Sequence, residues 1–255
     1  MNFVVNDFNI YYEKYGVGRN TIIILPGWGD TRSTFYKMIE VLKEFYTVYI
    51  LDYPGFGNSD FPNRDLTIYD YANLIKDFIK IMGIDNPIII GHSFGGRIGI
   101  ILTGLYKLNI KKMILIDSAG IKRKKSLKTK LKQFIYKCLK KLGTILPKNI
   151  RTIYLDKLIS IFGSTDFKNL EQNIRKTFIK VVNEDLTNYL KQINTSTLLI
   201  WGENDLDTPL DDGKLMNVKI EDSGLIIIPN AGHFPYLEYP YYINKIILEF
   251  LKTYM

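Results

Sequence analysis

Short apolar runs rich in β-branched residues recur along the chain and alternate with segments whose apolar residues have helical spacing. The runs predict strands at Ile10–Tyr15, Thr21–Leu25, Tyr46–Leu51, Ile88–Ile90, Met113–Ile116, Thr197–Trp201 and Leu225–Ile228. The first two strands are expected to form a hairpin. Helical spacing predicts helices at Thr34–Lys43, Leu66–Met82 and Tyr242–Leu251. Strands that alternate with helices in this way favour an α/β fold, with a mostly parallel sheet covered on both faces.

A serine follows one of these apolar runs in a glycine-rich turn. Ile88–Ile90 leads directly into Gly91, His92, Ser93, Phe94, Gly95 and Gly96, which match G-x-S-x-G, and a helix is predicted to follow. A serine on a sharp turn between strand and helix projects above the end of the strand, where a substrate can reach it. Ser93 is therefore the candidate nucleophile.

A serine needs a general base near neutral pH, and the base is most often a histidine held in one tautomer by a third group. The chain has two histidines. His92 is adjacent to Ser93, and neighbours on a sharp turn point apart, so we interpret His92 as a packing or hydrogen-bonding residue. His233 follows the run Leu225–Ile228 in a loop, where such folds carry their chemistry. His233 is therefore the candidate base.

Three carboxylates follow predicted strands and could orient the base. Thr197–Trp201 ends in a glycine turn that contains Glu203 and Asp205, and Met113–Ile116 is followed by Asp117. The order serine, acid, histidine along the chain favours the turn after Trp201. We predict Asp205 as the acid, rank Glu203 below it, and interpret Asp117 as a loop residue that bonds nearby backbone.

The order of Ser93, Asp205 and His233 on repeated strand–loop units resembles the α/β-hydrolase superfamily, and the resemblance covers nearly the whole chain. Its other motifs here are Leu25–Gly29, which looks like the oxyanion loop, and Asp52–Ser59, which matches D-x-x-G-x-G-x-S. The family often has His-Gly in the oxyanion loop, whereas this chain has Pro26 at the position of that histidine.

The resemblance implies a role for each of these residues. Ser93 attacks, His233 transfers the proton and Asp205 orients the imidazole. The backbone N–H groups of Trp28 and Phe94 bind the oxyanion. The side chains of Trp28, Phe94 and Phe234 line the substrate pocket.

The alternation of strands and helices stops between residues 121 and 188, where the spacing is helical. This is where the superfamily inserts a helical cap over its active site. We therefore expect an α/β-hydrolase core formed by residues 1–120 and 189–255, and a cap formed by residues 121–188.

The predicted cap carries a large excess of positive over negative charge. From Ser118 to Leu155 there are twelve Lys or Arg and no Asp or Glu, so a net charge of +8 leaves 8 − 12 = −4 for the rest of the chain. An apolar stripe that includes Phe134, Cys138 and Leu142 runs through the same segment. Two interpretations stay open. The segment could contact anionic membranes or lipid-like substrates, or it could be a solvated face whose apolar stripe packs on the core, which is the favoured interpretation.

These features predict a carboxylesterase-like serine hydrolase that acts on a small ester or acyl compound, lipid-like compounds included. The same triad also serves carbon–carbon bond hydrolases, thioesterases and lactonases. The carbon–carbon bond hydrolases commonly have Asn before the nucleophile and Trp after the histidine, where this chain has His92 and Phe234. An alternative of another class is a ligand-binding protein or receptor with a hydrolase fold.

Composition excludes several other classes. Two histidines and one cysteine, far apart in the 255-residue chain, give no metal-ligand spacing, and no phosphate-binding or dinucleotide fingerprint is present. We therefore expect no metal, no cofactor and no nucleic-acid partner. Without an apolar run of about 18 residues or a signal peptide, a cytoplasmic location is the expectation. The sequence leaves the oligomeric state open.

Overall fold

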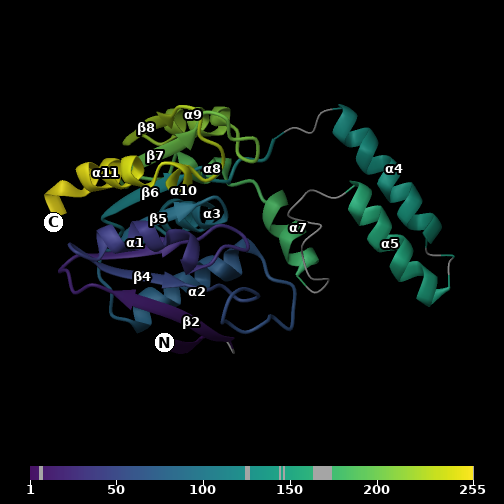
Figure 1. The fold of residues 1–255 in the computed structure, drawn as a ribbon, viewed down its shortest axis with the longest axis horizontal. Helices are drawn as coiled ribbons and strands as arrows, with labels where there is room; N and C mark the ends of the chain where they lie inside the picture. The colour runs from purple at the N-terminus through teal and green to yellow at the C-terminus, as the bar shows by residue number, and fades with distance from the viewer. Residues whose placement is uncertain (6–7, 124–126, 144, 146, 163–173, 255) are drawn as a thin grey trace.

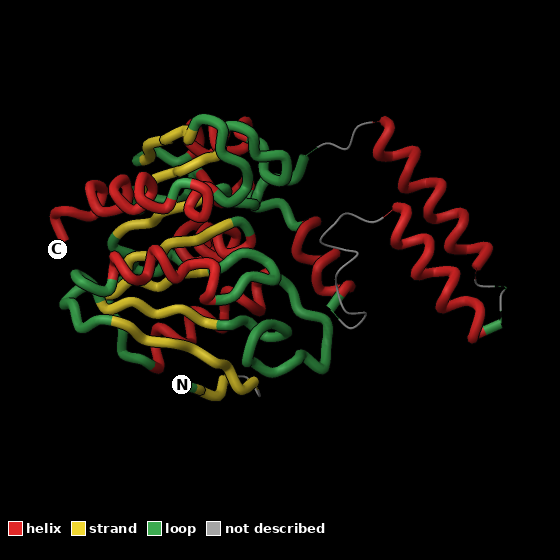
Figure 2. Tube along the Cα trace, viewed as in Figure 1, coloured by secondary structure: helices red, strands yellow, loops and turns green. Residues whose placement is uncertain are grey.

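One eight-stranded sheet forms the centre of the protein (Figures 1 and 2). The structure is a computed structural model that describes residues 1–254 except 6–7, 124–126, 144, 146 and 163–173. The strands are β1 (Asn2–Val5), β2 (Phe8–Tyr15), β3 (Thr21–Leu25), β4 (Thr47–Leu51), β5 (Ile88–His92), β6 (Lys112–Ile116), β7 (Thr197–Gly202) and β8 (Ser223–Ile228). Their order is β1-β2-β4-β3-β5-β6-β7-β8. The last six strands pair in parallel and the first two pair antiparallel, which confirms the prediction of a mostly parallel sheet flanked by helices.

Helices cover both faces of the sheet because the central strands are apolar on both sides. On one face, alternate residues such as Ile23 and Ile89 pack with α2 (Ile68–Ile81), α3 (Phe94–Ile100) and α9 (Leu210–Lys219). On the other face, their neighbours pack with α1 (Tyr36–Leu42), α10 (Pro235–Glu238) and α11 (Pro240–Leu251). The two apolar cores hold the sheet rigid between them, and a rigid sheet fixes the loops at its edge.

The predicted hairpin between the first two strands is wrong. Tyr12 of β2 pairs antiparallel with Leu51 of β4, and Ile22 of β3 pairs in parallel with Val48 of β4. Strand β4 therefore lies between the two segments that were expected to pair. The apolar pattern and the short linker favoured a hairpin, but neither of them specifies which strand is the neighbour. The sequence analysis also missed β1, a short strand that pairs with β2.

The described part of the chain between β6 and β7 is helical. It contains α4 (Leu127–Gly143), α5 (Lys148–Phe162), α7 (Arg175–Asn183) and α8 (Thr187–Leu190). Helices α4 and α5 lie side by side and stand away from the sheet, whereas α7 lies between this pair and the core (Figure 1). The division into a core and a cap of residues 121–188 stays a prediction.

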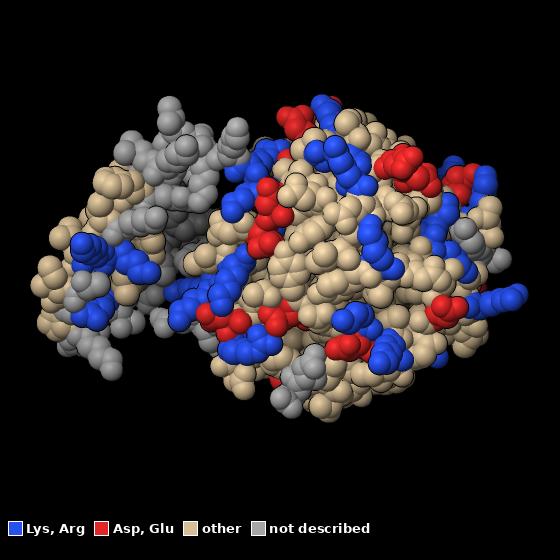
Figure 3. Space-filling view, turned by 180° about the vertical axis from the view of Figure 1, so that it is seen from behind, with Lys and Arg blue, Asp and Glu red and all other residues tan. Residues whose placement is uncertain are grey.

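The apolar stripe of α4 does not pack on the core, so the favoured interpretation of this helix is wrong. Phe134 is 65% exposed, Leu142 is 60% exposed, and Cys138 is exposed as well. The reason is that α4 packs on α5 and this pair extends away from the sheet. Basic side chains lie on its surface among uncharged ones (Figure 3). Membrane contact through this surface stays a prediction. No helix within the described ranges is both long enough and apolar enough to cross a bilayer.

The close approach of α3 to β3 depends on a glycine. A Cβ placed on Gly95 would lie 1.9 Å from the carbonyl oxygen of Leu25, which is backbone and cannot swing aside. Since β3 is held by β4 and β5 on its two sides, the clash has to displace the helix.

We predict that Gly95→Ala lowers the free energy of unfolding by about 1–3 kcal/mol, the usual cost of overpacking, although alanine is the better helix former by about 1 kcal/mol. Gly224→Ala in β8 is the matched control, because a Cβ there meets no heavy atom within 4 Å. Denaturant titration of both variants measures the difference. Equal stability of the two variants would contradict the packing argument.

Candidate active site

Ser93 occupies the turn between β5 and α3 in a strained backbone conformation. Its φ is +48° and its ψ is −108°, a combination that non-glycine residues rarely adopt. Neighbouring backbone enforces it. The Ser93 N–H donates to the carbonyl of Ile116 at 3.1 Å, and the Ser93 carbonyl accepts from the N–H of Ala119 at 3.0 Å. The loop after β6 thus holds the serine at the carboxyl edge of the sheet.

The glycines of the motif make this turn possible. A Cβ on Gly91 would lie 2.8 Å from the carbonyl oxygen of Gly95, and a Cβ on Gly96 would lie 2.0 Å from the Oγ of Ser118. The chain therefore folds back on itself more tightly than any side chain at these positions would allow.

His233 and Asp205 form a hydrogen-bonded pair at the ends of β8 and β7. The Nδ1 of His233 lies 2.8 Å from the Oδ2 of Asp205, the distance of a charge-assisted hydrogen bond. Asp205 is 3% exposed. Because Nδ1 donates to this carboxylate, the lone pair of Nε2 is left available to accept a proton.

The loop after β7 holds the carboxylate of Asp205 in place. Its Oδ1 accepts from the N–H groups of Asp207 and Thr208 at 2.8 and 3.0 Å, and its Oδ2 accepts from the Oγ1 of Thr208 at 2.6 Å. Burial alone would raise the pKa of Asp205, but the hydrogen bonds from His233 and Thr208 outweigh it and lower the pKa to about 2. Asp205 is therefore ionised across the neutral range.

The charge of Asp205 acts on the histidine in turn. Burial by itself would lower the pKa of His233, but the hydrogen bond and the negative charge of Asp205 raise it above the ordinary value of 6.5. A raised pKa means that the imidazolium is stabilised. That is the form a general base takes once it has accepted a proton.

His92 ties the serine turn to the histidine loop. Its ring is buried, and its Nε2 lies 2.9 Å from the backbone carbonyl of His233. Its Nδ1 lies 3.4 Å from both the Oδ2 of Asp30 and the hydroxyl of Tyr236. Burial lowers the pKa of His92, so the neutral ring donates from Nε2 to the carbonyl. His92 is the buried hydrogen-bonding residue that the sequence predicted, and it also fixes the backbone of His233 close to Ser93.

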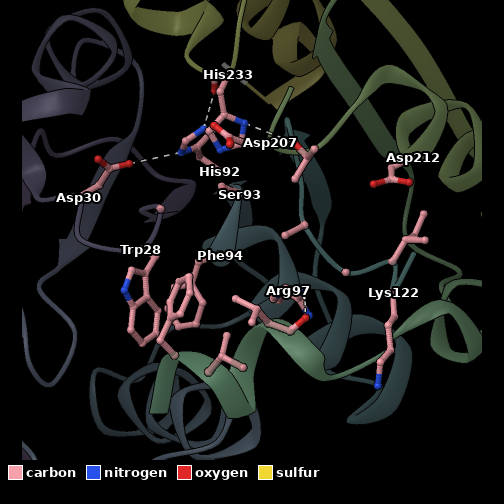
Figure 4. Close-up of a pocket in the computed structure, with 18 of the residues that line it drawn as sticks. Trp28, Asp30, His92, Ser93, Phe94, Arg97, Lys122, Asp207, Asp212 and His233 are labelled. Atoms are coloured by element: carbon pink, nitrogen blue, oxygen red, sulfur yellow. Dashed lines mark hydrogen bonds and ion pairs between the residues drawn. The ribbon is translucent and has the colours of Figure 1, made fainter. Parts of the chain in front are cut away.

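Ser93 and His233 line the same cavity, which has a volume of about 380 Å³. Figure 4 places Ser93 directly beside the rings of His92 and His233, with Trp28 and Phe94 below it. The cavity is also lined by Phe234, so the three predicted pocket residues are all at its wall. The structure therefore brings the predicted serine, histidine and acid to one place.

The other two acids are not partners of His233. Glu203 accepts from the N–H of Asn230 at 3.1 Å through its Oε2. Asp117 is fully buried. Its Oδ1 accepts from the N–H of Gly202 at 2.9 Å, and its Oδ2 has no hydrogen-bond partner among the residues that the structure describes. Burial raises the pKa of Asp117 to about 10. The nearby charge of Asp205 also raises it, whereas the hydrogen bond from Gly202 lowers it. Asp117 is therefore a neutral carboxylic acid beside the ionised one.

Two residues of the cavity wall have a backbone N–H group for which the described residues offer no acceptor. Phe94 is the first residue of α3, where a helix leaves its N–H groups unpaired. Trp28 lies in the turn after β3. Within the described part of the chain, neither N–H donates a hydrogen bond, and both residues line the cavity. The positive end of the helix dipole also lies at Phe94, so this position can stabilise negative charge.

Asp117, Asp205 and His233 are also the one group of potential metal ligands found in the described residues, with ligand atoms within 4.8 Å of one another. The geometry does not suit an ion. The 2.8 Å contact between Nδ1 of His233 and Oδ2 of Asp205 is a hydrogen bond with a proton between its atoms. Asp117 keeps its own proton. The donor set therefore fits a proton relay better than a metal centre.

Sequence reasoning missed several residues of the cavity wall. Arg97 comes from α3, Phe178 and Val181 come from α7, and Lys122 comes from the loop after β6. No motif marks them. Residues four apart share a helix face, so the spacing of Ser93 and Arg97 is a signal that could have marked Arg97, but its burial depends on how α7 packs.

Comparisons with known proteins agree with this geometry. A family model described as "alpha/beta hydrolase fold" matches residues 20–159. The uncharacterized hydrolase YugF of Bacillus subtilis is 30% identical over 98% of this chain and 97% of its own length. A pimeloyl-(acyl-carrier protein) methyl ester esterase of Wigglesworthia glossinidia brevipalpis is 27% identical, with 96% and 98% covered.

A third relative carries out a different hydrolysis. A 2-hydroxy-6-oxononadienedioate/2-hydroxy-6-oxononatrienedioate hydrolase of Pseudomonas putida is 26% identical over 96% of this chain and 92% of its own length. The matched family model spans more than half of the 255 residues. The chain therefore belongs to the α/β hydrolase family.

Proposed function

We propose that this protein is a serine hydrolase that cleaves carboxylic esters through an acyl-enzyme intermediate. The observation that carries the proposal is the buried hydrogen bond between Asp205 and His233 beside Ser93 in one cavity. An oriented base next to an exposed hydroxyl is what nucleophilic catalysis by serine requires.

In the first half-reaction, the Oγ of Ser93 attacks the ester carbonyl carbon while Nε2 of His233 takes the hydroxyl proton. The carbonyl oxygen becomes an oxyanion and accepts hydrogen bonds from the N–H groups of Trp28 and Phe94. Each such donor is worth about 3 kcal/mol in the transition state. The carbon–oxygen bond to the alcohol then breaks, and the imidazolium of His233 gives its proton to the departing oxygen.

In the second half-reaction, water replaces the alcohol. His233 takes a proton from the water as its oxygen attacks the acyl carbon. Collapse of the second oxyanion breaks the bond to Ser93, whose Oγ regains a proton from His233. Asp205 remains ionised throughout, because its low pKa leaves the proton on the imidazole.

Hydrolysis of a carbon–carbon bond is the second candidate, and the relative from Pseudomonas putida supports it. The same triad also serves thioesters and lactones. The esterase is favoured because the relative that is an esterase is matched over more of its own length, 98% against 92%, and because His92 and Phe234 replace the Asn and Trp common in carbon–carbon bond hydrolases. A binding protein with this fold would retain the geometry and lack turnover.

We expect a fluorophosphonate probe to label wild-type protein at Ser93, and p-nitrophenyl esters of short acids to be hydrolysed. Ser93→Ala should abolish both the label and the turnover, because it removes the attacking oxygen. Mass spectrometry locates the label. Labelling without turnover of any ester, thioester or lactone in a panel would contradict the hydrolase and favour the binding protein.

We expect Asp205→Asn to lower kcat by roughly 10⁴-fold, because the amide favours the wrong tautomer of the histidine. Asp117→Asn is the matched control. Its amide resembles the neutral acid already present, so kcat should stay within a few-fold of wild type. Steady-state kinetics on one ester compares them. A large loss in Asp117→Asn with none in Asp205→Asn would reverse the assignment of the acid.

A further inference from the structure

A buried positive charge lies in the same cavity as Ser93. Arg97 follows Ser93 by one turn of α3, and residues four apart lie on one face of a helix. It lines the cavity and is 5% exposed. Burial of an arginine costs free energy unless an opposite charge compensates for it, so its partners decide its role.

Among the described residues, the hydrogen-bond partners of this guanidinium are backbone carbonyls. Its Nη1 donates to the carbonyl of Glu184 at 2.9 Å, and its Nη2 donates to the carbonyl of Val182 at 3.5 Å. These carbonyls lie at the C-terminal end of α7, where the helix dipole is negative. Among the described residues, no carboxylate oxygen lies within 4.0 Å of Arg97. Burial lowers the pKa of Arg97 to about 10, so it remains charged at neutral pH.

The three carboxylates whose charges act on Arg97 form hydrogen bonds or ion pairs with other residues. Asp212 forms an ion pair with the Nε of Arg123 at 2.9 Å. The Oε1 of Glu184 accepts from the hydroxyl of Tyr69 at 2.7 Å. Asp185 accepts from the N–H of Thr187 at 3.1 Å. None of these acids forms an ion pair with Arg97, although their charges act on it from a distance. An anion in the cavity would therefore add a direct contact that none of the described carboxylates makes.

The cavity has charges on both sides of Ser93. Asp30 and Asp207 lie near His233. Arg97 and Lys122 lie on the other side of Ser93, and so does Asp212, whose carboxylate is paired with Arg123 (Figure 4). In the proposed mechanism His233 protonates the departing alcohol, so the alcohol half of the ester lies at the His233 end. The acyl half then extends toward Arg97.

We propose that Arg97 binds a carboxylate at the far end of the acyl chain, so that the substrates are half-esters of dicarboxylic acids. A guanidinium recognises a carboxylate through paired N–H donors. A cavity of about 380 Å³ is at the small end of ligand pockets, which favours short diacids. This subsite rests on the proposed ester hydrolysis. Lys122 is exposed and contributes little, because solvent screens it.

Matched substrates test the subsite by turnover. The mono-p-nitrophenyl esters of short diacids are compared with p-nitrophenyl alkanoates of equal length. Wild type should have a kcat/KM at least about tenfold higher for the anionic ester, the lower bound for a hydrogen bond to a charged group. Arg97→Gln should remove this preference, Arg97→Lys should retain part of it, and Lys122→Ala should retain it in full.

Loss of the contacts to α7 is a separate effect of Arg97→Gln, and the ratio of the two substrates distinguishes it. A purely structural arginine would lower kcat/KM for both substrates by the same factor, which would overturn the subsite. A wild-type preference for the neutral ester would overturn it as well.

Binding to an inactive variant separates the subsite from the chemistry. Calorimetry should show that Ser93→Ala binds the anionic half-ester at least about tenfold more tightly than the neutral ester, which is again the lower bound for a hydrogen bond to a charged group. The double variant with Arg97→Gln should bind both equally. Equal binding by Ser93→Ala itself would overturn the subsite. If Ser93→Ala binds the anionic half-ester more tightly but the wild type hydrolyses neither ester, the proposed ester hydrolysis is overturned instead.

Discussion

The buried hydrogen bond between His233 and Asp205 is the interaction on which the site depends. It sets the tautomer of the imidazole, and the negative charge of Asp205 raises the pKa of His233. The carboxylate can stay ionised in a buried place because four donor contacts reach its oxygens. The nearby carboxyl group of Asp117 is neutral instead, because a single N–H contact does not offset its burial.

The fold converts this pair into a site because the parallel strands all end at the same edge. The three residues follow neighbouring strands of the sheet: Ser93 follows β5, Asp205 follows β7 and His233 follows β8. Strand β6 lies between β5 and β7, and β8 is next to β7. The edge alone does not align their atoms. A hydrogen bond of 2.9 Å from His92 to the carbonyl of His233 also links the serine turn to the histidine loop.

Sequence reasoning found what depends on local chemistry. The glycines around Ser93 are required because a Cβ on any of them would lie 3 Å or less from a neighbouring atom, so a motif of small residues could be read without a structure. The order of residues along the chain and their positions after predicted strands identified Asp205 and His233 as candidates. The pairing of β2 with β4 was not predictable, because the apolar pattern specifies a strand and not its neighbour.

Features that depend on distant packing were not predictable either. In the sequence, no motif distinguishes Arg97 from other helical arginines. Its burial depends on packing that brings the carbonyl of Glu184, 87 positions away, within hydrogen-bond distance of its guanidinium. The neutral state of Asp117 follows from complete burial, which no motif indicates. The apolar stripe of α4 was expected to face the core, and its exposure depends on α5 as the packing partner.

The central claim is that the serine, the histidine and two amide donors converge on one reacting carbonyl. A crystal structure of the protein after reaction with a fluorophosphonate tests this most directly, because the adduct resembles the tetrahedral intermediate. We expect phosphorus bonded to the Oγ of Ser93, one phosphoryl oxygen within hydrogen-bond distance of the N–H groups of Trp28 and Phe94, and Nε2 of His233 facing the adduct. A phosphoryl oxygen turned away from both N–H groups, or an imidazole out of reach of the adduct, would contradict the claim.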